Sequence, residues 1–481
     1  MEHDLVVFVP GILGSRLTRD GRDLWHQSKQ AALQMLRPSR AAERLALPPG
    51  IGDNEPEEPW AVDADELLKG PDALPGLISF LGYPDVRAML DRSPDHHPQG
   101  GLRPGQYVPF AYDWRLSNRL NARRLRVRVE SALEQWRERA AGFYPQAHDD
   151  VPKVVFMCHS MGGLIARYYL ECLGGRDITR SLVTIGTPHR GAAKAVRFLT
   201  KNGVGPGADQ GRLRRKAMRK AARVNSALVD LARTFPSVAQ LLPVYKAAMA
   251  DGGNRWRPLT DGFVPDLPSE LVDDAFAFHR EFTDAWEASR SALPVAPYRV
   301  HCLGGRAHPT VHGVVVGVDG TLEFPTWLDN SQEWTGDGTV PEESAFAKWA
   351  LDDMSQAVWG GERHATMAGA ESVGHQLAAI RRGKPARETL AGEDFGLAAP
   401  DFAVAGEPFE VAVTGMADPG RTVRARLVRD GVPAADPVGL APDGTGSLVA
   451  DLTAPSGTWV LEVEADRPRV VCRDVVTVVE D

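Results

Sequence analysis

Short apolar runs, rich in β-branched residues, recur through most of the chain. They occupy residues 5–9, 154–158 and 181–186, and a further run begins at residue 298. Runs of this length suit strands that are buried on both faces, as in a parallel sheet. The pattern therefore predicts a central sheet assembled from distant parts of the chain.

Helical periodicity appears between these runs. Residues from about 120 to 140 are rich in charge, and their apolar members recur at spacings of four, four and three, at Leu125, Val129, Leu133 and Trp136. This spacing is typical of an amphipathic helix packed on a core. A second helix should follow the run at 154–158 and end at Gly174-Gly175. Strand, helix and strand in this order predict right-handed crossovers and a mostly parallel sheet.

Two stretches break this alternation, at about residues 19–105 and 198–295. The first mixes short helical patterns with Pro- and Gly-rich loops, and the second contains a basic run at 212–220. Open α/β sheets bind ligands at the carboxyl ends of their strands, so we interpret both stretches as cap insertions, the second a helical cap over that edge. The basic run is either a solvated helix face or a surface for anionic head groups.

The pattern changes at about residue 395. Apolar and polar residues now alternate in short segments, for example at 409–413, 423–427, 448–452 and 459–463, with Gly- and Pro-containing turns between them. Short alternating strands at this spacing favour a small β-sandwich of the immunoglobulin-like type. We therefore expect an α/β domain over residues 1–390 and a sandwich over 396–481, which has no nucleophile or metal cluster and serves in packing or in binding a protein partner.

Composition narrows the class of protein. The chain has 481 residues, a formal net charge of −8 and four scattered cysteines without metal-ligand spacing. The length predicts two or three domains, and the negative charge argues against a nucleic-acid partner. The cysteine pattern fits a reducing compartment, and the N-terminus shows no signal-peptide pattern, so we expect a cytoplasmic protein. No cofactor and no metal are expected.

The candidate chemistry begins where the second apolar run ends. Cys158-His159-Ser160-Met161-Gly162 resembles a nucleophile elbow, whose usual pattern is G-x-S-x-G, with Cys158 in place of the first glycine. The alternative is a serine that only caps a helix after a strand. A second feature, Pro10-Gly11 after the first run, offers the N–H of Ile12 as a donor to an oxyanion. Taken alone, the same residues equally fit an ordinary turn.

A serine nucleophile needs a base and an acid, and α/β hydrolases supply them in the chain order serine, acid, histidine. Asp337, between two glycines, and His364 satisfy this order. Rival residues are Asp319 in a hairpin turn, Asp329 in a loop, His375 inside the last helix, and His159 and His189, which precede the acid.

Six stretches together resemble the lecithin–cholesterol acyltransferase-like group of α/β hydrolases, which includes lysosomal phospholipase A2 and phospholipid–diacylglycerol acyltransferases. They occur in family order within residues 1–390: VPGILGSRL at 9–17, YDWRLS at 112–117, HSMGGLIARYYL at 159–170, TIGTPHRG at 184–191, GDGTVP at 336–341 and HATM at 364–367. The cysteine-bounded lid loop of the family's secreted animal members has no counterpart here, and the β tail lies outside the family pattern.

The resemblance implies an α/β-hydrolase fold, Ser160 as nucleophile, Asp337 as acid and His364 as base. It also implies the N–H groups of Ile12 and Met161 as the oxyanion hole and a lipid acyl ester as substrate. Peripheral membrane contact is a separate expectation. The sequence thus predicts a phospholipase- or lipase-like acyl-ester hydrolase or O-acyltransferase. The alternatives are a carboxylesterase for a small soluble ester, and a non-catalytic binding protein that uses its β-sandwich tail.

Overall fold

The computed structural model of the chain describes residues 2–26, 44–70, 72–74, 78–80, 82–83, 102–145, 150–201, 226–260, 262–292, 297–328, 332–333, 335–346, 357–383, 395–400, 402–416, 420–444, 446–467 and 469–480. The predicted basic run at 212–220 and the rival acid Asp329 lie outside these residues.

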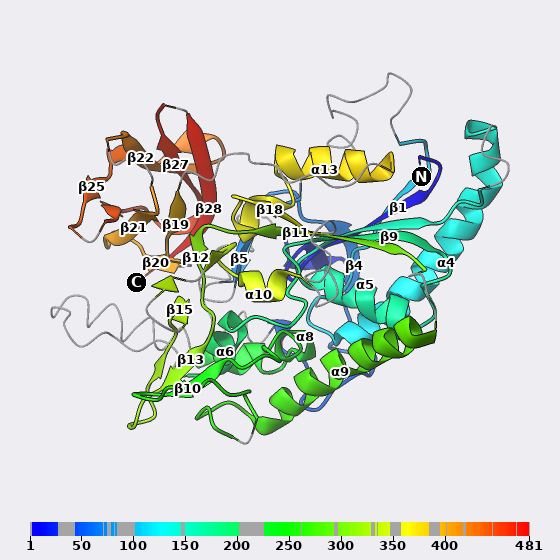
Figure 1. Cartoon of the computed structure of the whole chain (residues 1–481), viewed down its shortest axis with the longest axis horizontal. Helices are drawn as coiled ribbons and strands as arrows, with labels where there is room; N and C mark the ends of the chain where they lie inside the picture. Colours follow the sequence, from blue (N-terminus) through cyan, green and yellow to red (C-terminus); the bar gives the residue numbers. More distant parts are fainter. Residues whose placement is uncertain are drawn as a thin grey trace.

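A six-stranded parallel sheet forms the centre of the first domain (Figure 1). Its strands follow the order β18 (Ala357–Gly360), β11 (Arg299–Gly305), β9 (Thr179–Ile185), β8 (Val154–His159), β1 (Leu5–Val9) and β7 (Tyr107–Pro109). β1 and β8 are buried along their whole length. The continuous apolar runs therefore mark central strands, as predicted, because both faces of such strands are covered.

Helices connect and cover this sheet. They are α4 (Asn118–Phe143), α5 (Met161–Cys172), α6 (Lys194–Leu199), α8 (Pro236–Ala239), α9 (Ser269–Ala292), α10 (Glu342–Ala345), α12 (His364–Met367) and α13 (Glu371–Arg381). The four apolar residues that predicted the α4 stripe are all buried. Helix α4 begins after Ser117, whose hydroxyl accepts a hydrogen bond from the N–H of Arg119.

The insertions contain strands as well as helices. The described strands there are β3 (Arg22–Trp25), β4 (Asp63–Leu67), β5 (Asp72–Leu74), β6 (Ile78–Phe80) and β10 (Ala248–Ala250). β2 (Ser15–Arg19), at the start of the first insertion, pairs with β3 and β4. β10 pairs with β13 (Val314–Val316), which forms the predicted hairpin with β14 (Leu322–Glu323). Helix α9 packs against α5 through Phe278 and Phe282, which contact Leu164. The second insertion is therefore not wholly helical.

Two short two-stranded sheets follow β11 in the chain. They pair β12 (His308–Pro309) with β17 (Thr335–Gly336), and β15 (Trp327–Leu328) with β16 (Gln332–Glu333). The first of them leads directly into Asp337.

The C-terminal part of the chain is a β-sandwich, drawn in orange to red in Figure 1. One sheet holds β19 (Gly396–Ala398), β21 (Phe409–Thr414), β26 (Leu448–Leu452) and β25 (Ala441–Pro442). The other holds β20 (Phe402–Val404), β28 (Val470–Val479), β27 (Gly457–Ala465), β22 (Val423–Arg429), β23 (Val432–Pro433) and β24 (Val438–Gly439). Inward-facing residues of both sheets, such as Val411 and Leu461, share one core. The all-β prediction is confirmed, and its immunoglobulin-like type stays a prediction.

Candidate active site

Ser160 occupies a strained turn between β8 and α5. Its φ of 52° and ψ of −127° are values that non-glycine residues rarely adopt. The surrounding structure holds this conformation through two hydrogen bonds, from the Ser160 N–H to the carbonyl of Ile185 at 2.9 Å and from the Thr187 hydroxyl to the Ser160 carbonyl at 2.9 Å. This is the geometry of a nucleophile elbow, which exposes a serine oxygen at the end of a strand.

The elbow requires glycine two residues after the serine, at Gly162, and accommodates cysteine two residues before it, at Cys158. A Cβ at Gly162 would lie 2.4 Å from the carbonyl oxygen of Pro10, and a Cβ at Gly163 would lie 2.1 Å from the Thr187 hydroxyl. Cys158 instead fills core space and is completely buried. Burial raises the pKa of its thiol well above the usual value, which keeps it protonated and unreactive.

The structure brings together the three residues that the chain order selected. Ser160 Oγ lies 2.9 Å from His364 Nε2, and His364 Nδ1 lies 2.7 Å from Asp337 Oδ2. All three side chains are buried. Asp337 follows β17, while His364 opens α12 just after β18, so both partners stand at strand ends near the elbow. Hydrogen-bond reach between nucleophile, base and acid is what acyl transfer requires.

The carboxylate of Asp337 is fully engaged. Oδ2 faces His364, while Oδ1 accepts hydrogen bonds from the N–H of Thr339 at 2.9 Å and of Val340 at 2.6 Å. Burial alone would raise the pKa of Asp337, but the interaction with His364 and the two N–H donors outweigh it, and the pKa is lowered. The acid is therefore held ionised, with its orientation fixed by the backbone.

The rival residues that the structure describes do not form such a chain of contacts from the nucleophile to an acid. Asp319 bonds within its own hairpin turn, through the N–H and hydroxyl of Thr321. His375 is half-exposed on α13 and lies 3.7 Å from Glu371. His189 is buried and contacts the hydroxyl of Thr184 at 3.1 Å.

The two predicted oxyanion donors belong to the right segments. Gly11 lies against the nucleophile, since a Cβ on it would come within 2.8 Å of the Ser160 Cβ, and Ile12 is the next residue. Met161 is the first residue of α5. Within the described part of the chain, no hydrogen bond uses the N–H of Ile12 or of Met161. Both roles stay predictions, as do the roles of the three residues above.

Tyr83 and His159 form a network that the sequence did not reveal. The Tyr83 hydroxyl accepts a hydrogen bond from the N–H of Gly11 at 2.6 Å and lies 2.9 Å from His159 Nδ1. His159 Nε2 lies 3.2 Å from the carbonyl oxygen of His364. Burial, followed by the charge of His364, lowers the pKa of His159 to about 3, so it is neutral. A neutral ring with its proton on Nε2 satisfies all these contacts and ties the Gly11 loop to the backbone of His364.

The distinctive YDWRLS stretch is a scaffold. Arg115 and Asp113 form a completely buried ion pair at 2.7 Å, and Arg115 also donates to the carbonyls of Leu45 and Trp60 at 3.1 Å each. These bonds fasten the first insertion to the end of β7.

The described residues contain neither a metal centre nor a membrane span. Among them, no group of three or more His, Cys, Asp or Glu side chains is placed to hold a metal ion. None of their helices combines the length and the apolar character needed to cross a bilayer.

Comparisons with known proteins show a similarity that includes the segment around Ser160. The lecithin:cholesterol acyltransferase family model matches residues 89–261. The uncharacterized protein YJR098C of Saccharomyces cerevisiae is 26% identical over 159 residues, which are 32% of this chain and 21% of that protein. The chain therefore spans about a fifth of the length of this curated relative.

Two solved structures align with nearly the whole chain at low identity. The phospholipase PlaB of Legionella pneumophila aligns with 99% of this chain and 92% of its own at 11% identity and a TM-score of 0.32. The lipase BlEst2 of Bacillus licheniformis aligns with 98% and 93% at 12% identity and a TM-score of 0.26. The match to the family model over residues 89–261 includes the nucleophile turn and α5, so this part of the chain is similar to the lecithin:cholesterol acyltransferase family that the motifs resemble.

Proposed function

We propose that the protein is a serine acyl hydrolase or O-acyltransferase that acts on a lipid ester. The observation that carries this proposal is the unbroken contact chain from Ser160 Oγ through His364 to Asp337, at 2.9 and 2.7 Å. The family match over residues 89–261 supports the lipid ester as the substrate class.

The reaction begins at Ser160. His364 Nε2 takes the hydroxyl proton while Ser160 Oγ attacks the ester carbonyl, and Asp337 stabilises the imidazolium that forms. The N–H groups of Ile12 and Met161 bind the oxyanion of the tetrahedral intermediate. His364 then gives its proton to the departing alcohol, which leaves the acyl group esterified to Ser160.

The second half returns the enzyme to its starting state. Water or an acceptor alcohol loses its proton to His364 and attacks the acyl carbonyl, and His364 passes that proton back to Ser160 Oγ. Water gives hydrolysis and an alcohol gives acyl transfer, so one site supports both reactions.

The nucleophile is tested with a fluorophosphonate probe, which reacts only with an activated serine. We expect wild-type protein to label at Ser160, and Ser160→Ala to lose labelling and to lower kcat by about a thousandfold or more. Ser291→Ala, which changes an exposed serine of α9, is the matched control and should label normally. A wild type that does not label, or a Ser160→Ala variant that labels equally, contradicts the proposal and favours a non-catalytic binding protein.

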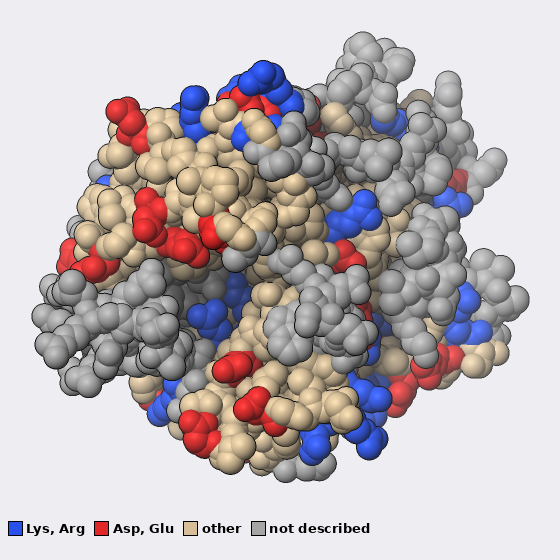
Figure 2. Space-filling model, turned by 60° about the vertical axis from the view of Figure 1, so that its left-hand side comes forward, with Lys and Arg blue, Asp and Glu red and all other residues tan. Residues whose placement is uncertain are grey.

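The substrate class is tested separately. Turnover of phospholipid vesicles is compared with turnover of short-chain soluble esters, and a preference for the soluble esters would identify a carboxylesterase. Peripheral membrane contact is part of this proposal. On the face shown in Figure 2, basic and acidic side chains of the described residues are interspersed. A cytoplasmic location remains a prediction, supported by four free cysteines.

A further inference from the structure

Arg363 connects the active-site histidine to the β-sandwich. It immediately precedes His364, yet its side chain points into the second domain, where its Nε lies 2.7 Å from Asp474 Oδ2 on β28. Its Nη1 also donates a hydrogen bond to the carbonyl of Leu397 on β19. Arg363 and Asp474 are each 7% exposed. An ion pair with so little solvent contact is held in one geometry.

The same arginine also packs on the loop that carries the acid. A Cβ at Gly338 would lie 2.8 Å from Arg363 Cζ, so the guanidinium covers the residue that follows Asp337. Only glycine permits this approach, and Gly338 has a φ of +86°. Arg363 therefore contacts the acid loop and the sandwich at once.

A second connection runs through His308. This completely buried residue lies on β12, beside β17. Its Nδ1 accepts a hydrogen bond from the N–H of Leu397 at 3.1 Å. Its Nε2 lies 2.8 Å from the carbonyl oxygen of Gly361, in the segment 361–368 that contains His364 and is called the histidine loop below. The N–H and the C=O of Leu397 thus each bind a residue of the hydrolase domain. β19 is an edge strand of its sheet, paired on one side with β21. Its other side forms hydrogen bonds with the hydrolase domain.

The backbone of the histidine loop depends on these supports. The His364 N–H donates to the Asp337 carbonyl at 2.8 Å, and the Arg363 carbonyl accepts the N–H groups of Thr366 at 3.0 Å and Met367 at 2.9 Å. A shift of Arg363 would move all three bonds, and with them the imidazole that faces Ser160.

We propose that the β-sandwich is a structural part of the active site, and that Arg363, held by Asp474 and Leu397, is a positioning residue for His364. This inference rests on the proposed function and adds to it a role for the C-terminal domain. It predicts that a change in the sandwich, remote from the nucleophile, alters the chemical step.

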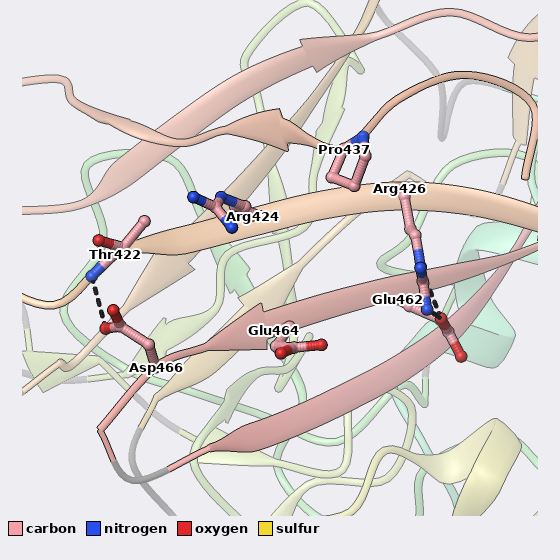
Figure 3. Close-up of a pocket in the computed structure, with 7 residues that line it drawn as sticks. All are labelled: Thr422, Arg424, Arg426, Pro437, Glu462, Glu464 and Asp466. Carbon is pink, nitrogen blue, oxygen red and sulfur yellow. Dashed lines mark hydrogen bonds and ion pairs between the residues drawn. The ribbon is translucent and has the colours of Figure 1, made fainter.

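The sandwich itself supplies a matched control. The hollow on its outer face is lined by Thr422, Arg424, Arg426, Pro437, Glu462, Glu464 and Asp466 (Figure 3). Glu462 binds Arg426 at 2.6 Å and Arg473 at 2.9 Å. This ion-pair cluster lies in the same domain as Asp474, and its pairs are made within the sandwich.

The test compares Asp474→Asn with Glu462→Gln in the full-length chain. Turnover is normalised to folded sites by active-site titration, so that loss of folded protein does not count as loss of rate. We expect Asp474→Asn to lower kcat by about tenfold or more with KM nearly unchanged, because small displacements of a catalytic group cost rate rather than binding. Glu462→Gln should retain the wild-type kcat. Adding Arg363→Gln to Asp474→Asn should cost less than the two single effects combined.

Hydrogen exchange provides a readout that does not need activity. Amides of residues 361–368 should exchange faster in Asp474→Asn than in wild type, and should be unchanged in Glu462→Gln. Wild-type kcat and wild-type exchange in Asp474→Asn would overturn the proposal, as would equal losses in both variants. If the wild-type chain hydrolyses no ester, the proposed function fails, and the exchange of residues 361–368 still decides whether Asp474 positions the loop.

Discussion

At the scale of single residues, Tyr83 links the Gly11 loop, through His159, to the backbone of His364. Its hydroxyl accepts a hydrogen bond from the N–H of Gly11 and is also hydrogen-bonded to Nδ1 of His159. Nε2 of His159 is in turn hydrogen-bonded to the carbonyl oxygen of His364. The buried N–H of Gly11 thereby obtains a partner, while the next N–H, that of Ile12, has none among the described residues. The tyrosine thus occupies the N–H of Gly11 and leaves that of Ile12 for its predicted role as oxyanion donor.

Tyr83→Phe should weaken the protein and the chemical step together. Removing the hydroxyl leaves the buried N–H of Gly11 unpaired, which costs about 1–3 kcal/mol of the free energy of unfolding. We also expect a lower kcat because His159 loses the partner that orients it. Urea unfolding and titrated turnover measure the two effects. Tyr144→Phe, which loses one bond to Gln106 at 3.1 Å far from the nucleophile, is the control. Equal behaviour of the two variants would contradict the role of Tyr83.

The residues predictable from the sequence are those that a motif or the chain order selects. Ser160 stands in a recognisable turn, and Asp337 and His364 follow in the order that the fold imposes. Tyr83, His308 and Arg363 carry no such signal. Their partners lie far away in the chain, as with Tyr83 and His159, 76 positions apart, so only the folded backbone reveals the contacts.

At the scale of elements, the site depends on the close approach of β1 to α5. Gly162 sits where the helix begins, and a Cβ there would lie 2.4 Å from the Pro10 carbonyl and 2.5 Å from the Val9 carbonyl. Both neighbours are backbone atoms at the end of a buried strand, so neither can rotate away. The second glycine of the elbow pattern is therefore a steric requirement, whereas the position of Cys158 is not.

Gly162→Ala should destabilise the protein by about 1–3 kcal/mol or more, because the methyl group overpacks a site that cannot relax. The thermal midpoint of unfolding is the measurement. Gly142→Ala is the matched control, since Gly142 lies in α4 and a methyl group there would meet nothing within 4 Å. That control should raise stability by up to about 1 kcal/mol, as expected for glycine in a helix. A Gly162→Ala protein as stable as wild type would show that the elbow has room to adjust.

The pattern of apolar and polar residues identified the strands and helices that pack on the core along their whole length. The same pattern was least informative in the insertions. β1, β8 and α4 have uniform patterns because the core contacts them along their length. The short insertion strands β5 and β10 contain only three residues each, too few to show a period. Their pairing is decided by tertiary contacts, which is why a helical cap was expected where a strand also forms.

At the scale of the whole molecule, several histidines of the hydrolase domain are buried and have lowered pKa values. Burial is the first cause in each case, and it lowers the pKa to about 3 for His159 and His308 and to about 4 for His279, His301 and His312. Each buried ring would have to take up a charge without water around it. Acid should therefore act on this domain through its histidines.

The direction of the pH effect follows from proton binding. The unfolded chain protonates histidine near its ordinary pKa of about 6.5, while the folded chain binds these protons only near pH 3–4. Between these values the unfolded state holds more protons, so stability is complete above about pH 6.5 and falls as the pH is lowered. Each such histidine contributes a slope of about 1.4 kcal/mol per pH unit in that window.

The contribution of one histidine can be isolated. His279, whose Nε2 lies 3.0 Å from the Gln240 carbonyl, is replaced by glutamine, which keeps a hydrogen-bond donor but does not titrate. We expect the slope of unfolding free energy against pH, measured by urea unfolding from pH 7 to pH 5, to decrease by about 1.4 kcal/mol per pH unit relative to wild type. A slope in His279→Gln equal to that of wild type would mean that protonation of His279 does not contribute to the loss of stability between pH 7 and pH 5.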